Sequence, residues 1–332
     1  MTPFRIGDFE VAAGTRKTVE LPISVLANHT PISLPVHVIH GAKPGPTFFI
    51  SAVVHGDEIL GVEIVRRVVS HSALKELAGT LLAVPIVNTF GFLNHSRYMP
   101  DRRDLNRSFP GSDHGSLASL LADLFMKEVV LRSQYGIDLH TAALHRTNLP
   151  QIRIAPDEPE LLKMAKLFAP PVILISKLRE GTLRQCARDQ GVKVLLYEAG
   201  EALRFDEMAI ETGLHGILRV MASLKMIALP PHSEIKHQTA ISLSSTWLRA
   251  PEGGVLRSSL PTGAHVSKGE KIGEISNPLG DLSVQVIAED DGIIIGRTNL
   301  PIVNRGDALF HVARMKKSDL VQQPLFDEDE II

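Results

Sequence analysis

The first residues whose types and spacing could do chemistry are His55 and Glu58. They are the first and last residues of the segment HGDE (55–58), which directly follows an apolar run at 48–54. The run predicts a strand. His55 would then stand at its carboxyl end, and Glu58 in the first turn of a helix, where residues three apart share a face. One imidazole and one carboxylate could converge there on a metal ion. Alone, the pair also fits an ordinary strand-end histidine beside a helix-start glutamate.

A second strand-end histidine, His140, supplies a third candidate ligand. It ends the segment YGIDLH (135–140), and Asp138 lies two residues earlier, on the same side of the predicted strand. From that side Asp138 could hydrogen-bond to a ligand imidazole. Two histidines and one glutamate form a known ligand set for catalytic Zn²⁺, with a fourth position left to water. The sequence therefore predicts one Zn²⁺ per chain, held by His55, Glu58 and His140.

A charged and proline-containing segment at 97–111 carries four arginines within eleven residues. Guanidinium groups pair bidentately with carboxylates. A cluster of this kind beside two candidate metal ligands could bind a substrate carboxylate, and the alternative is an ordinary solvated loop. The four arginines are Arg97, Arg102, Arg103 and Arg107.

Glu198 stands at the end of another apolar run, in the segment VLLYEAG (194–200). A carboxylate at the end of a strand in a hydrophobic sheet lowers the stability of the fold unless it is solvated, and such a carboxylate can be kept because it has a chemical role. Such a glutamate is a candidate general base for a metal-bound water. The alternative is an ordinary strand-end glutamate.

The pattern of the whole chain predicts the frame that holds these residues. Over roughly the first 225 residues apolar runs alternate with helical patterns, which indicates an α/β fold with a mostly parallel sheet covered by helices on both faces. Strands are expected at 34–39, 47–54, 81–87, 135–139, 151–154, 172–175 and 192–197, and helices at 58–69, 117–131, 160–168, 182–190 and 205–225. Active sites in such folds gather at the carboxyl ends of strands.

The chain then divides into three expected regions: a catalytic domain at 1–235, a small all-β domain at 236–314 and an acidic tail at 315–332. Turn-rich sequence without helical period defines the second region. It resembles the biotinyl/lipoyl-type barrel-sandwich hybrid, in which a lysine carries the cofactor. No lysine occurs between Ile272 and Arg314, so a carrier role is not expected. The region could instead cover the active-site mouth, shape specificity or mediate assembly.

Composition excludes several classes of function. The 332 residues are 44% hydrophobic and 22% charged, with a net charge of -2, which gives no reason to expect nucleic acid or an anionic membrane as a partner. The single cysteine, Cys186, permits no internal disulfide. We find no secretory signal and no apolar stretch near the ~20 residues of a membrane span, so a cytoplasmic location is expected. Homo-oligomerisation stays open.

Together the four segments resemble the succinylglutamate desuccinylase/aspartoacylase family, within the larger group of zinc carboxypeptidase-like folds. The matching segments are HGDE (55–58), DLNRSFPG (104–111), DLHTA (138–142) and YEAG (197–200), in the order of the family and within about residues 34–224. The resemblance implies a mixed, mostly parallel sheet with helices on both faces. It also implies His55, Glu58 and His140 as zinc ligands.

The resemblance further implies roles for the residues around the metal. Glu198 would be the catalytic acid and base, and Asp104 would orient His55. Arg97 would polarise the scissile carbonyl, with Arg102 and Arg103 as rivals for that role. Three residues would bind the substrate, with its carboxylate held by the first two: Asn106, Arg107 and Arg102.

The expected reaction is hydrolysis of the amide, or an ester, of a small N-acylated amino acid or related amine, which releases a carboxylate and a free amine. A metallocarboxypeptidase acting on a peptide end is the alternative within enzymes. A non-catalytic binding protein that kept the fold is the alternative outside them.

Overall fold

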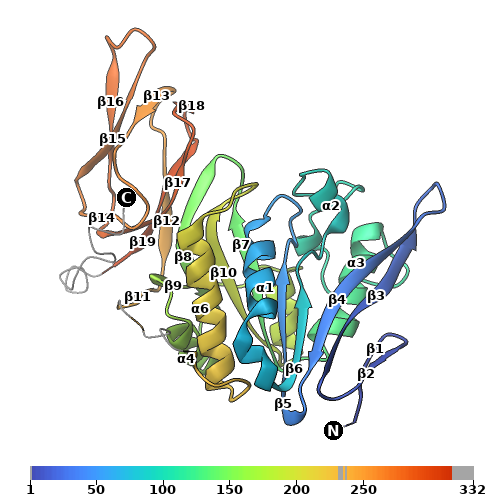
Figure 1. The fold of residues 1–332 in the computed structure, drawn as a ribbon. Coiled ribbons are helices and arrows are strands. Elements are labelled where there is room, and N and C mark those ends of the chain that lie inside the picture. Colours follow the sequence, from blue (N-terminus) through green and yellow to red (C-terminus); the bar gives the residue numbers. More distant parts are fainter. Residues whose placement is uncertain (1, 231–234, 236–237, 316–332) are drawn as a thin grey trace.

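The computed structural model describes residues 2–230, 235 and 238–315, so the predicted acidic tail, apart from Met315, lies outside the described residues (Figure 1). It shows a mixed α/β fold followed by a region of strands only, which confirms the predicted fold class. No helix of the described part of the chain is long and apolar enough to cross a membrane.

The α/β region begins with strands and then alternates strands with helices. Its elements are β1 (Phe4–Ile6), β2 (Phe9–Val11), β3 (Thr15–Val25), β4 (Pro31–His40), β5 (Lys43–Ala52), α1 (Leu60–Ser70), β6 (Ala78–Val84), α2 (Thr89–Leu93), α3 (Leu117–Phe125), β7 (Tyr135–Ala142), β8 (Arg146–Ile154), α4 (Pro159–Phe168), β9 (Val172–Ile175), α5 (Leu183–Asp189), β10 (Lys193–Glu201) and α6 (Glu207–Ser223).

Nine short strands follow among the described residues of the C-terminal region. They are β11 (Ala240–Ser242), β12 (Ser245–Arg249), β13 (Gly254–Arg257), β14 (His265–Val266), β15 (Lys271–Ser276), β16 (Ser283–Ile287), β17 (Gly292–Thr298), β18 (Ile302–Val303) and β19 (Ala308–Arg314). Four of these strands form a separate sheet: β13, β15, β16 and β18. The other five belong to the large sheet.

One large sheet joins the two regions. Its strand order is β12-β19-β17-β8-β10-β7-β5-β6-β4-β3, with β9 beside β8 and β11, and β14 beside β17. The four central strands, β10, β7, β5 and β6, are parallel, while β8 and β4 run antiparallel on either side of them. Strand β17 pairs directly with β8, so the C-terminal strands continue the sheet of the α/β region past its parallel centre (Figure 1).

Helices cover both faces of the sheet, as a parallel centre requires. One core cluster joins α1, α4 and α6 to the sheet, and Tyr197 lies fully buried within it. The second cluster lies on the other face and joins α3 and α5 to the sheet and to the first strands. The central strands are therefore mostly apolar on both sides, and buried polar residues such as Ser51 and Asp138 interrupt this pattern.

Local differences from the prediction have physical reasons. The N-terminal strands β1 to β3 were not predicted, because β3 alternates buried residues such as Val19 and Leu21 with exposed charged ones and has no continuous apolar run. The helix expected at 117–131 ends as an α-helix at Phe125 and continues as a π-helical turn, Met126–Val130.

Candidate metal centre

Three adjacent parallel strands bring the predicted ligands together. His55 follows the end of β5, and His140 lies near the end of β7. Ser51 on β5 stands opposite Asp138 on β7, and Glu198 on β10 stands opposite His140. The strands β5, β7 and β10 lie side by side in the sheet (Figure 1). Because paired residues of neighbouring parallel strands share a face, these side chains meet at the carboxyl edge of the sheet.

The turn between β5 and α1 differs from the prediction at Glu58. Helix α1 starts at Leu60 with Ile59 as its N-cap, so Glu58 lies in the turn before the helix and not in its first turn. The turn is tight: Val53 takes a positive φ of 59°, and a Cβ at Gly56 would collide with the backbone of Gly91. A close backbone approach therefore fixes glycine at position 56.

The Glu58 carboxylate lies between the two imidazoles. Its Oε1 is 2.7 Å from Nδ1 of His55, and its Oε2 is 2.7 Å from Nδ1 of His140. Potential ligand atoms of the three residues all lie within 4.8 Å of one another, and all three residues are buried. No other group of at least three histidine, cysteine, aspartate or glutamate residues with this geometry occurs among the described residues.

Each histidine is oriented from behind by an aspartate. Nε2 of His55 lies 3.0 Å from Oδ1 of Asp104, and Nε2 of His140 lies 2.8 Å from Oδ2 of Asp138. Carboxylates accept hydrogen bonds, so Nε2 of each ring donates to its aspartate, and Nδ1 is the ring nitrogen that faces Glu58. Asp138 is itself held by the Ser51 hydroxyl, which donates to its Oδ1 at 2.7 Å.

These orientations fit a cation. Nδ1 of His55 is buried and makes no hydrogen bond within the described residues, although Oε1 of Glu58 is 2.7 Å away. A lone pair and a carboxylate oxygen at that distance need positive charge between them, either a proton or a metal ion. Two nitrogen ligands and one oxygen ligand are a set that Zn²⁺ takes. The residues present thus fit the metal that the sequence predicts.

The pKa shifts show the same mutual stabilisation of charge. Burial raises the pKa of the Glu58 carboxyl, but the imidazoles of His55 and His140 outweigh this and hold it well below its usual range. Burial lowers the pKa of His140, but the carboxylates of Asp138 and Glu58 outweigh it and raise that pKa well above the usual value. The cluster is built to balance positive charge against buried carboxylates.

Arg97 is the arginine of the 97–111 segment that contacts the cluster. Its Nη1 donates to Oε1 of Glu58 at 2.9 Å, and its Nη2 donates to Oδ2 of Asp104 at 3.2 Å. Arg102 is exposed, and its guanidinium makes no hydrogen bond or ion pair within the described residues. Arg103 lies 3.6 Å from Asp101, away from the ligands.

The segment is anchored and not simply solvated. Leu105 is fully buried and Phe109 nearly so, which fixes the residues between them. Asp104 caps this stretch by accepting from the backbone N–H of Asn106 at 2.8 Å. Oδ1 of Asn106 in turn accepts from the backbone N–H of Leu183 at 3.0 Å, so the loop is tied to the start of α5. Arg107 is exposed beside this anchor.

Glu198 is held at both carboxylate oxygens. Asn148 on β8 donates from Nδ2 to Oε2 at 2.8 Å, and Nη1 of Arg153 lies 3.3 Å from Oε1. The side chain is 14% exposed, so it can still be reached. Its place opposite His140 puts a carboxylate beside the candidate metal centre, where a general base would be needed.

Sequence reasoning missed Arg153, Asn148 and Arg184. Burial and the charge of Arg153 lower the pKa of Arg184 to about 10, while Glu198 and Asp138 act in the opposite direction. Its Nη1 is buried without a hydrogen bond within the described residues. The residue pattern offered no signal for these three, because their interactions with Glu198 join segments that are far apart in the chain.

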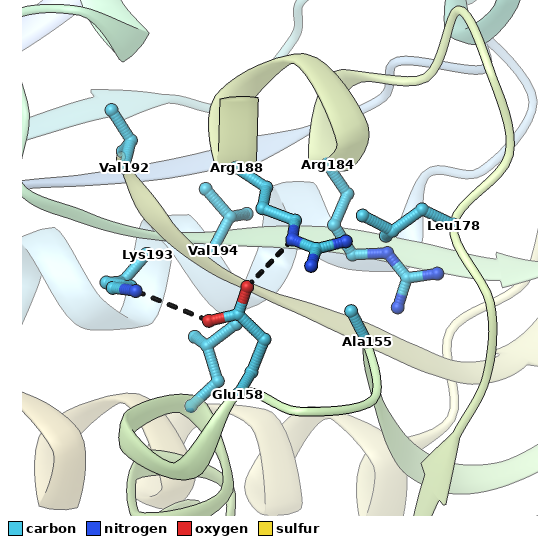
Figure 2. Close-up of a pocket in the computed structure, with 9 residues that line it drawn as sticks. Ala155, Glu158, Leu178, Arg184, Arg188, Val192, Lys193 and Val194 are labelled. Carbon is cyan, nitrogen blue, oxygen red and sulfur yellow. Dashed lines mark hydrogen bonds and ion pairs between the residues drawn. The ribbon is translucent and has the colours of Figure 1, made fainter. Parts of the chain in front are cut away.

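Figure 2 shows how Arg184 leaves α5 beside Arg188 but extends past Ala155. Arg188 and Lys193 instead pair with Glu158, at 2.9 Å and 3.3 Å. The cavity between these side chains holds about 10 Å³, room for one water. It is therefore a packing gap and too small for a substrate.

Comparison with known proteins agrees with this geometry. Residues 44–224 match the succinylglutamate desuccinylase/aspartoacylase catalytic domain. A curated relative, N-alpha-acetyl-L-2,4-diaminobutyric acid deacetylase of Halomonas elongata, is 27% identical over 329 residues, and the match covers 94% of both chains.

Solved structures share the fold over nearly the whole chain. The product-bound ectoine utilization protein EutE (DoeB) of Ruegeria pomeroyi has a TM-score of 0.80 at 20% identity and matches 91% of this chain and 95% of its own. A succinylglutamate desuccinylase/aspartoacylase from Rhodobacter sphaeroides has a TM-score of 0.79 at 24% identity, with 90% and 95% covered. The match to the catalytic domain covers more than half of the residues of this chain, which therefore belongs to the succinylglutamate desuccinylase/aspartoacylase family.

Proposed function

We propose that this chain is a zinc-dependent deacylase that hydrolyses the amide of a small N-acylated amino acid or N-acyl diamine. The observation that carries the proposal is the buried cluster of His55, Glu58 and His140, with Glu198 on the neighbouring strand. Membership of the family supports the reaction class. The deacetylase name of the Halomonas relative supports an N-acyl amino acid as substrate.

His55, Glu58 and His140 would hold the metal. Bound zinc supplies a Lewis acid for the scissile carbonyl and lowers the pKa of water to about 7. The aspartates behind the imidazoles accept from Nε2 of each ring and so keep both Nδ1 atoms turned toward the site. They would therefore tune metal affinity without touching the substrate.

Glu198 would act as general base and then return the proton to the departing amine. Its two hydrogen-bonding partners hold the carboxylate in one orientation, and its partial exposure leaves it open to a water and a substrate. Proton transfer of this kind contributes about 10²- to 10⁴-fold in rate.

Arg97 would stabilise the developing negative charge on the carbonyl oxygen. Two of its nitrogens are held by Glu58 and Asp104, and a guanidinium has five N–H donors, so donors remain for the substrate. The pairing also places the positive charge beside the metal ligands before substrate arrives.

Asn106 and Arg107 would bind the substrate carboxylate, with Arg102 as a further candidate. Because Oδ1 of Asn106 accepts from Leu183, its Nδ2 is left as the free donor of that amide. The Arg107 guanidinium is exposed next to it and can pair bidentately with a carboxylate.

The test is a hydrolysis screen with zinc present and with zinc removed. The substrates are N-acetyl, N-succinyl and N-formyl amino acids, Nα-acetyl-2,4-diaminobutyrate and a set of short peptides. We expect release of free amine from at least one N-acyl amino acid or N-acyl diamine, loss of activity with a chelator, and recovery with zinc. The Glu198→Gln protein, purified identically, controls for contaminating hydrolases. Cleavage of peptides only, or full activity in the metal-free protein, would contradict the proposal.

A further inference from the structure

The C-terminal strand β17 makes an irregular contact with the catalytic strand β8. Gly296 stands opposite Asn148 on β8 and opposite His311 on β19. The register between β17 and β19 shifts between Ile294 and Gly296, which marks a bulge. Bulges redirect side chains and carbonyls locally, so residues at this point can make contacts that a regular strand would not allow.

The first contact is steric. A Cβ at position 296 would lie 2.8 Å from Oδ1 of Asn148 and 3.3 Å from Cβ of His311. The backbone of Gly296 is not in the left-handed region, so glycine is required by its neighbours and not by φ. The absent side chain makes room for the Asn148 amide, whose Nδ2 then donates to Oε2 of Glu198.

The second contact is polar and leads to the other oxygen of Glu198. Gln151 on β8 is fully buried and donates from Nε2 to the carbonyl of Ile295, at 3.0 Å. Its Oε1 accepts from Nε of Arg153 at 3.4 Å, and Nη1 of Arg153 lies 3.3 Å from Oε1 of Glu198. Both oxygens of Glu198 are thus connected to residues 295 and 296 through side chains of β8.

We propose that the β17 bulge at Ile295 and Gly296 is a positioning element for Glu198. The C-terminal strands then do more than cover the catalytic domain, because they fix the orientation of the general base. This proposal rests on the proposed function, in which Glu198 takes the proton. Asn148 and Gly296 are positioning residues that act through Glu198 and need not touch the substrate.

The position of the Glu198 carboxylate should control the rate of proton transfer. A general base must lie within hydrogen-bond reach of the proton that it accepts, and misplacement by about 1 Å can cost on the order of 100-fold in rate. A carboxylate held by donors at both oxygens has one orientation, whereas a carboxylate that has lost one donor can rotate away.

The test substitutes Gly296→Ala, Asn148→Ala and both together, and measures kcat, KM and zinc content. The clash at Gly296→Ala falls on the end of the Asn148 side chain, which can move, and the 3.3 Å approach to Cβ of His311 requires only a small shift, so the variant should fold. Gly253→Ala in the same region is the matched control, since its Cβ would make only ordinary contacts, the nearest at 3.6 Å.

We expect Gly296→Ala and Asn148→Ala each to lower kcat by roughly 10- to 100-fold with KM and zinc content unchanged. In the double variant the Cβ at 296 no longer meets the Asn148 amide, so its kcat should match that of Asn148→Ala within about twofold. Gly253→Ala should behave as wild type. Additive losses, or losses that follow a fall in thermal stability, would overturn the proposal.

Crystal structures of wild type and Gly296→Ala separate this inference from the proposed function. We expect the Asn148–Glu198 hydrogen bond to be absent in the variant and the Glu198 carboxylate to have rotated. If both side chains keep their positions, the positioning role is refuted even when no substrate has been found. If they move but wild type hydrolyses no N-acyl amino acid, the proposed function fails and the positioning of Glu198 stands.

Discussion

The two halves of the candidate site are supported by different parts of the chain. The metal ligands are held entirely within the α/β region, by two aspartates and Arg97. Glu198 is held by side chains of β8 that rest on β17, which belongs to the C-terminal region. Metal binding and turnover should therefore separate experimentally, because changes near β17 reach Glu198 without reaching the ligands.

The largest expected effect is at the metal ligands. His140→Ala removes one of three ligands, leaves the buried carboxylate of Asp138 without its imidazole partner and leaves Glu58 with only His55. We expect no zinc after dialysis and no measurable turnover. Zinc content by mass spectrometry and steady-state kinetics check this. His114→Ala, whose side chain is 92% exposed, is the control and should keep both zinc and activity. One zinc per chain at unchanged affinity in His140→Ala would break the ligand assignment.

The second-largest expected effect is at Glu198, which belongs to the half of the site that does not hold the metal. Glu198→Gln keeps the shape of the side chain but removes its basicity, so we expect full zinc content and a loss of roughly 10²- to 10⁴-fold in kcat. Glu201→Gln on the same strand is the control, since Glu201 accepts from the backbone of His145 and from Asn299 and not at the cluster. Loss of zinc together with activity in Glu198→Gln would show that the two halves are not separate.

A smaller effect is expected at the aspartates behind the histidines. Asp138→Asn and Asp104→Asn should each weaken zinc affinity by roughly 10- to 100-fold. We expect the larger loss for Asp138, whose side chain is 1% exposed against 16% for Asp104, because water cannot replace the lost acceptor there. Competition titration against a chelator measures both. Equal or reversed losses would mean that burial does not set the strength of this support.

The sequence was informative where function depends on short segments of chain. His55 and His140 each lie at or just after the carboxyl end of an apolar strand. Such ends of a parallel sheet meet at one edge, so the convergence of the two histidines could be predicted from the residue pattern alone. The helical placement of Glu58 was wrong because the helix begins two residues later, after a tight turn set by contact with Gly91. That contact joins residues 35 apart, which no local pattern reports.

The support of Glu198 could not be predicted for the same reason. Asn148 and Gly296 are unremarkable in sequence, and their pairing depends on β17 joining the edge of the catalytic sheet 148 residues later. Arg97 likewise could not be separated from Arg102 and Arg103 by type or spacing. Only the folded loop shows which guanidinium contacts Glu58.

The smallest effect concerns the residue beside Glu198 in the chain. Tyr197 points to the opposite face of β10, where it packs against Phe168 and donates from its hydroxyl to the carbonyl of Ala209 at 2.6 Å. Tyr197→Phe removes that hydrogen bond and should lower the free energy of unfolding by about 1 kcal/mol. We expect kcat, KM and zinc content to stay at wild-type values, because the contacts of Glu198 lie on the other face. Urea unfolding and steady-state kinetics check this. A fall in kcat at unchanged stability would mean that the α6 side of the strand also positions the base.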